Sequence, residues 1–454
     1  MDTFNFNWKP EYRGTWNCPS CGNEIYGTLK ITQGDIILEL LCHSCHKIEG
    51  IHLESITGRV DSLDANNVLA VKLCNLSLVS TKVSMGEGFS TYKYVAEDIF
   101  ATSDINALSS PIKTVRFFSD YIGLWSKKHY TNNIVESFNA HGIKLEYNQP
   151  EPYKCFEDES ILVELFYTFW CKTHNNQGSI LNTKHSLDIT FKEPSEDFYR
   201  AKVKAFQMSY LFSLLIQRPV DIGNIFYLTD KGTFIHRNGL RYRNVIIRET
   251  PFTSNNFADL TSEKLNSMVS KWRSYYQKYV NSLDTFFEIW NHELLPSEQR
   301  FKGYMSVIDG LTSDFFIESN GQTKNTKRVR AINEILLKVS NCECVLSKNE
   351  INTLKMAALR ERSDSVEIRF CELLKILNGI LPERIDDEFV YKCARTRNKI
   401  THPESEYEDD IFTPSQYPKA VCELEIILCS YLLSYIGMDK DLIKQTIRIY
   451  DIHG

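Results

Sequence analysis

The sequence lacks a long uninterrupted apolar segment. Its longest apolar stretch, around residues 424–438, is broken by Glu425, Ser430 and Ser434 and is too short to span a bilayer comfortably. The first residues also lack the basic and apolar regions of a secretory signal. We therefore expect a cytoplasmic protein with no membrane partner, in which residues 424–438 form a buried helix.

An excess of positive charge is absent as well. The chain has 52 Lys and Arg residues against 58 Asp and Glu residues, and its formal net charge is -6 at pH 7. This balance excludes a protein that binds nucleic acid over its whole surface, but it allows a local basic site. No internal repeat, low-complexity tract or helix-turn-helix pattern is visible, so a zinc-dependent regulator of transcription is a weaker alternative.

The composition is that of an ordinary folded protein. With 454 residues, the chain is long enough for two or three domains with separate cores. Hydrophobic residues make up 43% and charged residues 24%, which is typical of soluble globular proteins. The 23 Tyr and 26 Phe residues predict cores rich in aromatic rings.

Strand signals dominate the first 255 residues. Residues 27–32 and 35–40 flank Gln33-Gly34, which predicts a hairpin with a tight turn. Asn238-Gly239 between residues 233–236 and 241–247 predicts a second hairpin. Other β-rich runs are found at residues 70–79 and 186–191, and one inserted helix is predicted at residues 198–215.

Helical periodicity dominates after Pro251. A cap-like start near Asp259 opens an apolar stripe that continues to Trp290. Further helices are predicted at residues 299–319, 326–340, 348–378, 386–402 and 415–436, with breaks at 319–322 and 378–382. The expected fold class is α+β multidomain, with a β-rich domain at residues 1–255, a connecting helix at 256–298 and an all-α bundle at 299–454.

One ordered group stands out among the 13 cysteines. The pattern C-x2-C-x20-C-x2-C is formed by Cys18, Cys21, Cys42 and Cys45. Four thiolates in tetrahedral geometry make a closed, structural Zn²⁺ site with no open position for catalysis. We expect a zinc-knuckle insertion over about residues 15–50, and the alternatives are a chance pattern or a ligand drawn from His43 or His46.

A short motif near the C-terminus suggests chemistry. Arg397 is followed by Asn398 and, five positions on, by His402, which matches the Arg-x4-6-His pattern of HEPN-type ribonucleases. An arginine can hold a phosphate with a bidentate fork, and a histidine can move protons near neutral pH. The alternative is a helix C-terminus whose cations favour the helix dipole.

The spacing of the motif has a geometric consequence. On a regular helix, Arg397 and His402 would be about 140° apart around the axis. Pro403 disfavours the α conformation of His402, so the helix should end at Thr401 or His402. A second copy of the chain could then bring two arginines and two histidines together on one phosphate.

The predicted reaction is attack of a ribose 2′-OH on the adjacent phosphate. His402 would act as general base or general acid, and Arg397 would stabilise the charge on the phosphorane oxygens. Asn398 would hydrogen-bond the phosphate or orient a side chain across the interface. This chemistry requires no catalytic metal.

Residues 396–403 resemble the "tRN…tH" signature of the HEPN domain in ApeA-type proteins, which are bacterial anti-phage effectors. Residues 12–16, 26–29 and 56–58 are similar to motifs of the β-rich N-terminal domain of that family. The resemblance implies an abortive-infection endoribonuclease with tRNA as its expected substrate. It also implies a homodimer or higher oligomer, and a phage-encoded trigger is a further expected partner.

Other charged residues are candidates for supporting roles. Some HEPN proteins use an acid on an earlier helix, for which Asp309 is the first candidate here and Glu318 the second. Lys327, Arg328 and Arg330, next to Lys324, could contact an RNA backbone, or they could form an ordinary solvated face. The acidic run Glu404–Asp410 could cover the site and restrain it. The rival interpretation of the helical domain is a non-catalytic module for nucleic-acid binding or dimerisation.

Overall fold

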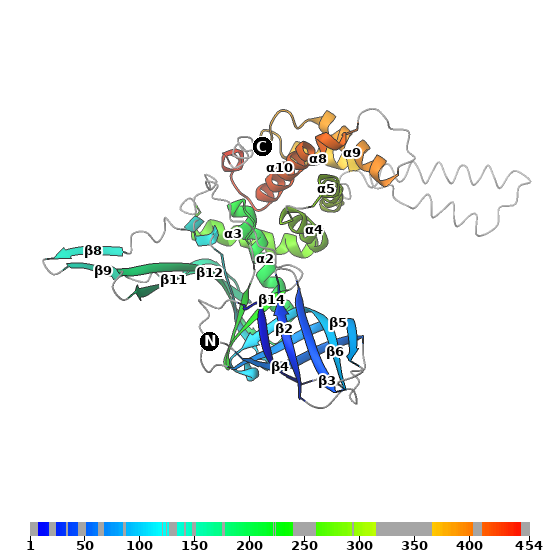
Figure 1. Cartoon of the computed structure of the whole chain (residues 1–454). Coiled ribbons are helices and arrows are strands. Elements are labelled where there is room, and N and C mark those ends of the chain that lie inside the picture. Colours follow the sequence, from blue (N-terminus) through cyan, green and yellow to red (C-terminus); the bar gives the residue numbers. More distant parts are fainter. Residues whose placement is uncertain are drawn as a thin grey trace, which may run out of the picture. The chain divides into compact units, whose positions relative to one another are not determined.

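The computed structural model describes a large part of the chain. The described residues are 8–17, 24–32, 35–43, 51–61, 68–84, 88–119, 121–123, 125–126, 134–139, 142–147, 151–174, 178–220, 222, 224–238, 260–292, 295–314, 366–402 and 411–445. The chain divides into two compact units, Met1–Ser270 and Lys271–Gly454. The first is rich in strands and the second is helical (Figure 1), so the expected order of a β-rich region and a helical region is confirmed.

Six strands at the N-terminus close into a barrel. They are β1 (Glu11–Asn17), β2 (Glu24–Ile31), β3 (Ile36–His43), β4 (His52–Asp61), β5 (Val68–Ser84) and β6 (Phe89–Thr102). Their order is β6-β3-β2-β1-β4-β5, and a further antiparallel pairing of β5 with β6 closes the ring. The predicted hairpin at residues 27–40 is confirmed, because β2 and β3 pair from Tyr26↔Leu41 to Ile31↔Ile36.

The barrel core explains the glycines and the tryptophan of the N-terminal motifs. Trp16 is fully buried, and side chains alternate between core and surface along β3. A Cβ atom placed on Gly58 would lie 2.5 Å from the Trp16 ring, and one placed on Gly27 would lie 2.8 Å from it. Both positions therefore require glycine because the indole packs directly against their backbone.

The sheet continues beyond the barrel through β14. The added strands are β7 (Ile112–Phe118), β10 (Tyr153–Glu157), β11 (Ile161–His174), β12 (Gly178–Ser195), β13 (Ile225–Thr229) and β14 (Gly232–Asn238). The order from β10 to the barrel is β10-β11-β12-β7-β13-β14-β6, all within one 12-stranded sheet. Helix α2 (Phe198–Ile216) contacts β7 and β12 and buries most of its C-terminal half.

Two paired segments extend past this arrangement. β11 and β12 pair from Ile161↔Phe191 to His174↔Gly178, whereas β10 and β7 contact only their base. The result is a long two-stranded ribbon (Figure 1). Strands β8 (Ile134–Asn139) and β9 (Gly142–Tyr147) form a separate two-stranded sheet, and η1 (Ile105–Ser109) is a short 3₁₀ turn between β6 and β7.

The second hairpin differs from the prediction. β14 does contain residues 233–236, but its two edges are taken by β13 and by β6. Residues 234–236 therefore have no free strand edge with which residues 241–247 could pair. Residues 241–247 themselves lie outside the described residues. The hairpin turn instead connects Thr229 to Gly232, where a φ of 133° requires glycine. The local Asn-Gly signal was overridden by long-range pairing with the barrel.

A charged cluster is buried where β14 joins the barrel. Asp98 of β6 accepts a hydrogen bond from Lys202 of α2 at 3.0 Å and contacts His236 Nε2 of β14 at 2.7 Å. Burial alone would raise the pKa of Asp98, but His236 and Lys202 outweigh this effect and hold it at about 2. Burial lowers the pKa of His236, against the opposing effect of Asp98.

The helical unit is built around aromatic side chains. Its described elements are α3 (Ser262–Lys278), α4 (Val280–Trp290), α5 (Ser297–Leu311), α8 (Val366–Ile376), α9 (Asp387–Thr401), η4 (Pro414–Gln416) and α10 (Tyr417–Tyr435). Trp272, Phe286 and Tyr304 are fully buried. The division between the two units falls inside α3. One connecting helix was expected over 256–298, but the described residues of this segment hold α3, α4 and the first two residues of α5, with α3 and α4 separated at Tyr279.

The other predicted helices have different outcomes. The helix at 198–215 corresponds to α2, and those at 386–402 and 415–436 correspond to α9 and α10. α10 buries much of its length, as expected of residues 424–438, and among the described residues no helix is long and apolar enough to cross a membrane. The predicted helix 326–340 and the break at 319–322 lie outside the described residues, as does the first part of 348–378.

Candidate functional site

The end of α9 presents the Arg–His motif. Asp386 caps the start of this helix by accepting a hydrogen bond from the Phe389 backbone, and the last helical residue is Thr401. His402 leaves the α conformation with φ -129° and ψ 81°, while its backbone N–H still donates to the Asn398 carbonyl at 2.7 Å. The prediction that the helix ends at Thr401 or His402 is therefore confirmed.

Asp309 lies beside the arginine of the motif. It occupies the last turn of α5, a helix held in the core by buried residues that include Phe301 and Ile308. Its Oδ2 atom is 3.7 Å from Arg397 Nη2, and the side chains of Asp309 and Arg397 are 34% and 30% exposed. The structure thus brings together two of the residues that the sequence singled out, and both can still be reached from solvent.

A third charged residue joins them from α8. Arg369 donates from Nη1 to the Asp309 backbone carbonyl at 3.0 Å, and its Nη2 donates to Asp309 Oδ1. The Arg369 side chain is only 5% exposed. Sequence reasoning missed this residue. The available signal was its position four residues before Leu373, on the apolar face of a helix. A cation buried on such a face requires a partner of opposite charge or a hydrogen-bond acceptor.

The other residues of the motif have local roles. Arg397 Nη1 donates to Asn398 Oδ1 at 3.3 Å, so the two neighbouring side chains are linked. Thr396 is buried, and its hydroxyl accepts a hydrogen bond from the Phe412 backbone at 2.9 Å. This contact ties α9 to the segment that leads into α10, and it gives the threonine of the signature a structural function.

The turn between α8 and α9 determines which ends of these helices meet. Gly379 has a φ of 75°, which glycine adopts without strain, and Asp386 starts the next helix. The chain reverses here, so the beginning of α8 lies near the end of α9. Arg369 and Arg397 therefore reach the same carboxylate although each is far from the turn.

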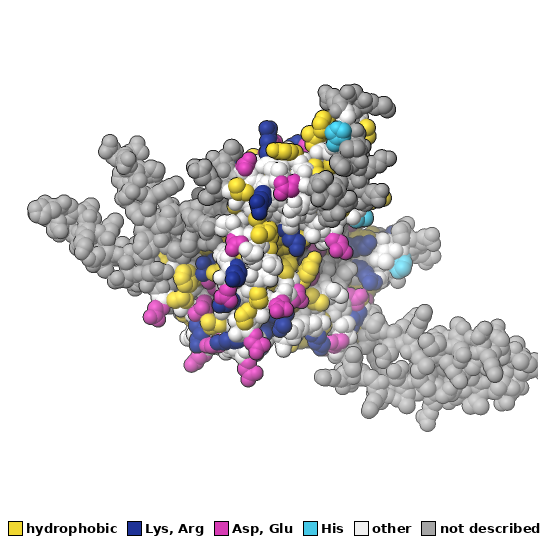
Figure 2. Space-filling model, turned by 90° about the horizontal axis from the view of Figure 1, so that it is seen from below, with side chains coloured by type: hydrophobic (Ala, Val, Ile, Leu, Met, Phe, Trp, Pro, Cys, Tyr) yellow, Lys and Arg dark blue, Asp and Glu magenta, His cyan; other side chains and the backbone are white. Residues whose placement is uncertain are grey.

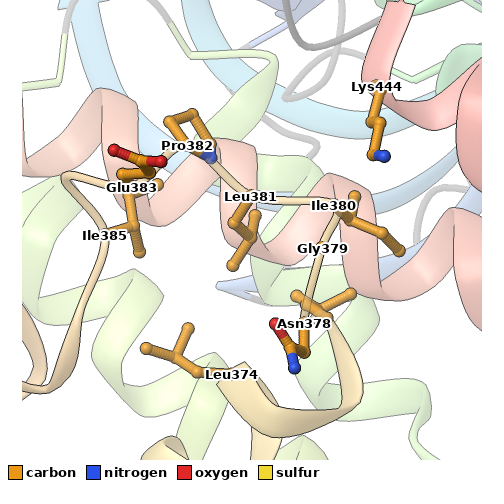
Figure 3. A pocket seen from close by; sticks show the side chains of 10 residues that line it. Leu374, Asn378, Gly379, Ile380, Leu381, Pro382, Glu383, Ile385 and Lys444 are labelled. Carbon is orange, nitrogen blue, oxygen red and sulfur yellow. The ribbon is translucent and has the colours of Figure 1, made fainter.

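A separate groove of about 620 Å³ lies at this turn. Its lining includes the apolar residues Leu374, Ile380 and Ile385, together with Lys444 from another segment (Figure 3). Ile385 directly precedes α9, whereas Arg397 is in its last turn, and a helix of 15 residues is about 22 Å long. The groove and the Arg397 cluster are thus at opposite ends of α9.

The surface charge gives no broad basic field on the face shown in Figure 2. Basic and acidic side chains of the described residues are interspersed there. On α9, the Arg395 guanidinium lies over the Tyr391 ring, 4.2 Å from its centroid. The net charge of -6 argues against a basic field over the whole surface, so attraction for a phosphate would come from local groups such as Arg397.

Most of the predicted zinc ligands lie outside the described residues, as Cys18, Cys21 and Cys45 do. Cys42 is 2% exposed near the end of β3. The register pairs Asn17 with Glu24 and Tyr26 with Leu41, so the strand ends that flank both cysteine pairs lie at the same end of the barrel. Cys42 itself belongs to the hydrophobic core of the barrel, and the Zn²⁺ site stays a prediction. Among the described residues, no group of three His, Cys, Asp or Glu residues could hold a metal ion.

Several other candidates also lie outside the described residues. These are Glu318, the cations Lys324, Lys327, Arg328 and Arg330, and the acidic run Glu404–Asp410. Their proposed roles in binding RNA or restraining the site stay predictions.

The comparison with known families agrees with the fold of the first unit. The profile of ApeA N-terminal domain 1 matches residues 11–272, from the first barrel strand into α3. The chain belongs to the ApeA family. It is therefore an ApeA-type anti-phage protein, as the N-terminal motifs indicated. No curated protein and no solved structure matches the chain.

Proposed function

We propose that the helical unit is a HEPN endoribonuclease that cuts RNA during anti-phage defence and needs no catalytic metal. The observation that supports this most is the cluster at the end of α9, where Arg397 lies 3.7 Å from Asp309 and His402 turns out of the helix. Membership of the ApeA family supports the role in defence. tRNA is the expected substrate because of the resemblance of residues 396–403 to the ApeA signature.

The residues divide the chemistry between charge and proton transfer. Arg397 holds the scissile phosphate and stabilises the charge that develops on its oxygens. A histidine removes the proton of the 2′-OH, which attacks the phosphorus, and a protonated histidine donates a proton to the leaving 5′ oxygen. The products are a 2′,3′-cyclic phosphate and a free 5′-OH. Asp309 and Asn398 orient the guanidinium of Arg397.

This reaction favours a site shared by two copies of the chain. One imidazole cannot accept a proton from the attacking oxygen and donate a different proton to the leaving oxygen at the same time. Each copy offers one histidine of the motif, His402, at the end of α9. A homodimer would supply both the base and the acid, together with two arginines for the phosphate oxygens.

The N-terminal unit takes the regulatory role in this proposal. A structural Zn²⁺ held by Cys18, Cys21, Cys42 and Cys45 would stabilise one end of its barrel. The metal would take no part in the cleavage. A phage-encoded trigger would act through this unit.

The decisive experiment compares wild type with Arg397→Ala and His402→Ala. Purified proteins are incubated with tRNA in the presence of a chelator, and the RNA ends are mapped. Wild type should leave 2′,3′-cyclic phosphates, and both variants should lose about 100-fold or more of the rate. Arg395→Ala is the matched control, because Arg395 is on the same helix but lies over Tyr391 rather than beside Asp309.

The same proteins are expressed in bacteria challenged with phage. Toxicity and RNA cleavage should require both Arg397 and His402. Equal behaviour of all folded variants, with and without phage, would exclude the nuclease. RNA binding without cleavage would then favour the alternative, a non-catalytic HEPN module for nucleic-acid binding or dimerisation.

A further inference from the structure

Three charged side chains from three helices form one linked cluster. Arg369 of α8 donates to both the backbone carbonyl and the carboxylate of Asp309 on α5. The other carboxylate oxygen lies 3.7 Å from Arg397 of α9. The aspartate therefore stands between two guanidinium groups, one on each of its oxygens.

The two contacts differ in strength. Arg369 is 5% exposed and makes two hydrogen bonds to Asp309, so its desolvated charge is compensated by this carboxylate. The pair of Asp309 with Arg397 is longer than a hydrogen bond, and both side chains are about one-third exposed. Solvent screens such a pair, so it is weaker than the contact between Asp309 and Arg369. Asp309 is therefore held mainly by Arg369.

The charge of the cluster follows from this arrangement. Among these three described side chains, two guanidinium groups and one carboxylate leave one unit of positive charge. Because Arg369 is buried, that surplus lies on the exposed side, at Arg397. If Arg369 were neutral, the carboxylate would cancel the charge of Arg397, and a phosphate would have to displace it.

We propose that Arg369 is a positioning residue that takes up the charge of Asp309 and so leaves Arg397 available to a phosphate of RNA. The choice of RNA as the ligand rests on the proposed function. Arg369 itself does not touch the substrate. Its effect is electrostatic and geometric, since it fixes the carboxylate that orients Arg397 and cancels the negative charge of that carboxylate.

The test measures RNA binding in proteins that also carry His402→Ala, so that the RNA stays intact. The probe is a fluorescently labelled tRNA, and its dissociation constant is followed by anisotropy over a series of salt concentrations. Arg369→Gln should weaken binding about tenfold, and it should reduce the slope of log K against log salt by about 1. Arg369→Lys keeps the charge and should bind nearly as well as the parent.

The double variant Asp309→Asn with Arg369→Gln separates this role from a purely structural one. It removes the charges of both Asp309 and Arg369 and does not change Arg397. The cluster therefore again has a surplus of one positive charge. Its affinity and salt slope should therefore recover to within about threefold of the parent, since the charge that sets the slope is restored. A double variant that binds as weakly as Arg369→Gln overturns the inference.

The rate of RNA cleavage distinguishes the two proposals. It is measured for the same substitutions in the protein that keeps His402. If wild type cleaves tRNA while Arg369→Gln binds and cleaves equally well, the inference fails and the proposed function stands. If wild type neither binds nor cleaves RNA, both fail. Should Arg369→Gln fold poorly, the double variant still tests the inference, because it removes Arg369 and the carboxylate of Asp309 together, and binding much weaker than that of the parent overturns it.

Discussion

Asp309 at the end of α5 lies 3.7 Å from Arg397 in the last turn of α9. The carboxylate lies beside the guanidinium without enclosing it, since about one-third of each side chain is exposed. The pair connects the motif at the end of one helix to a distant part of the chain. Substitution of Asp309 should therefore affect the rate of RNA cleavage and the affinity for RNA differently.

Asp309→Asn should lower the rate of RNA cleavage about tenfold without weakening RNA binding. The substitution removes a negative charge near the phosphate site, which favours binding, but it releases the guanidinium of Arg397. It also leaves Arg369 buried without its carboxylate, so stability should fall by about 1–3 kcal/mol. Single-turnover kinetics and thermal unfolding measure the two effects. A loss of affinity larger than the loss of rate would contradict this role.

Dilution should abolish cleavage as completely as the loss of His402. A site completed by a second copy of the chain disappears when the dimer dissociates, because each monomer keeps only one histidine of the motif. Specific activity should therefore fall as protein concentration is lowered, in parallel with the dimer fraction seen by mass photometry. Constant specific activity in samples that are monomeric would show that one chain suffices.

The purified chain should contain one Zn²⁺, measured by elemental analysis. Cys18→Ser or Cys21→Ser should lose the metal and lower the melting temperature of the N-terminal unit, because metal binding contributes directly to folding. Cys74→Ser is the control, since Cys74 lies on β5 outside the cysteine pattern. Retention of zinc in both ligand variants would rule out the four-cysteine site.

Acid should destabilise the N-terminal unit in two steps. Burial lowers the pKa of His185 to about 4 and also lowers that of His236, so the unfolded chain binds protons that the folded one does not. The N-terminal unit should keep its full stability with respect to these two histidines above about pH 6.5. Its free energy of unfolding should fall as the pH drops below that value. Below about pH 4, protonation of Asp98, whose pKa is about 2, adds a further loss.

His236→Gln tests the first of these steps. Glutamine can donate to Asp98 but does not titrate, so the melting temperature should change less between about pH 7.5 and about pH 5 than in wild type. His52→Gln is the control, because His52 is exposed on β4. Identical pH dependence of wild type and His236→Gln would exclude His236 as a cause.

Gly58→Ala should destabilise the barrel by about 1–3 kcal/mol. The added methyl group would lie 2.5 Å from the fully buried Trp16 ring, which has no space to retreat within the packed core. Thr57→Ala on the same strand should have a smaller effect because Thr57 is only half-buried. Urea unfolding followed by tryptophan fluorescence gives both values, and equal losses would contradict the packing argument.

The sequence by itself determined the local elements and the candidate residues. The helix at 198–215, the hairpin at 27–40 and the helix end at Thr401 depend on periodicity, turn residues and a proline, which act over a few neighbouring positions. Asp309 was named from the sequence only through a family resemblance. The match to the ApeA family likewise agrees with short N-terminal motifs whose tryptophan and glycines pack in the barrel.

Only the tertiary structure decided how these elements meet. Closure of the barrel through β5 and β6, and the occupation of both edges of β14, depend on pairings between distant strands that no local pattern encodes. The role of Arg369 is of the same kind. Its partner Asp309 is on another helix, and the packing of α5, α8 and α9 brings the two together. A charged residue on the apolar face of a predicted helix indicates that it needs a partner. The identity of that partner depends on how the helices pack.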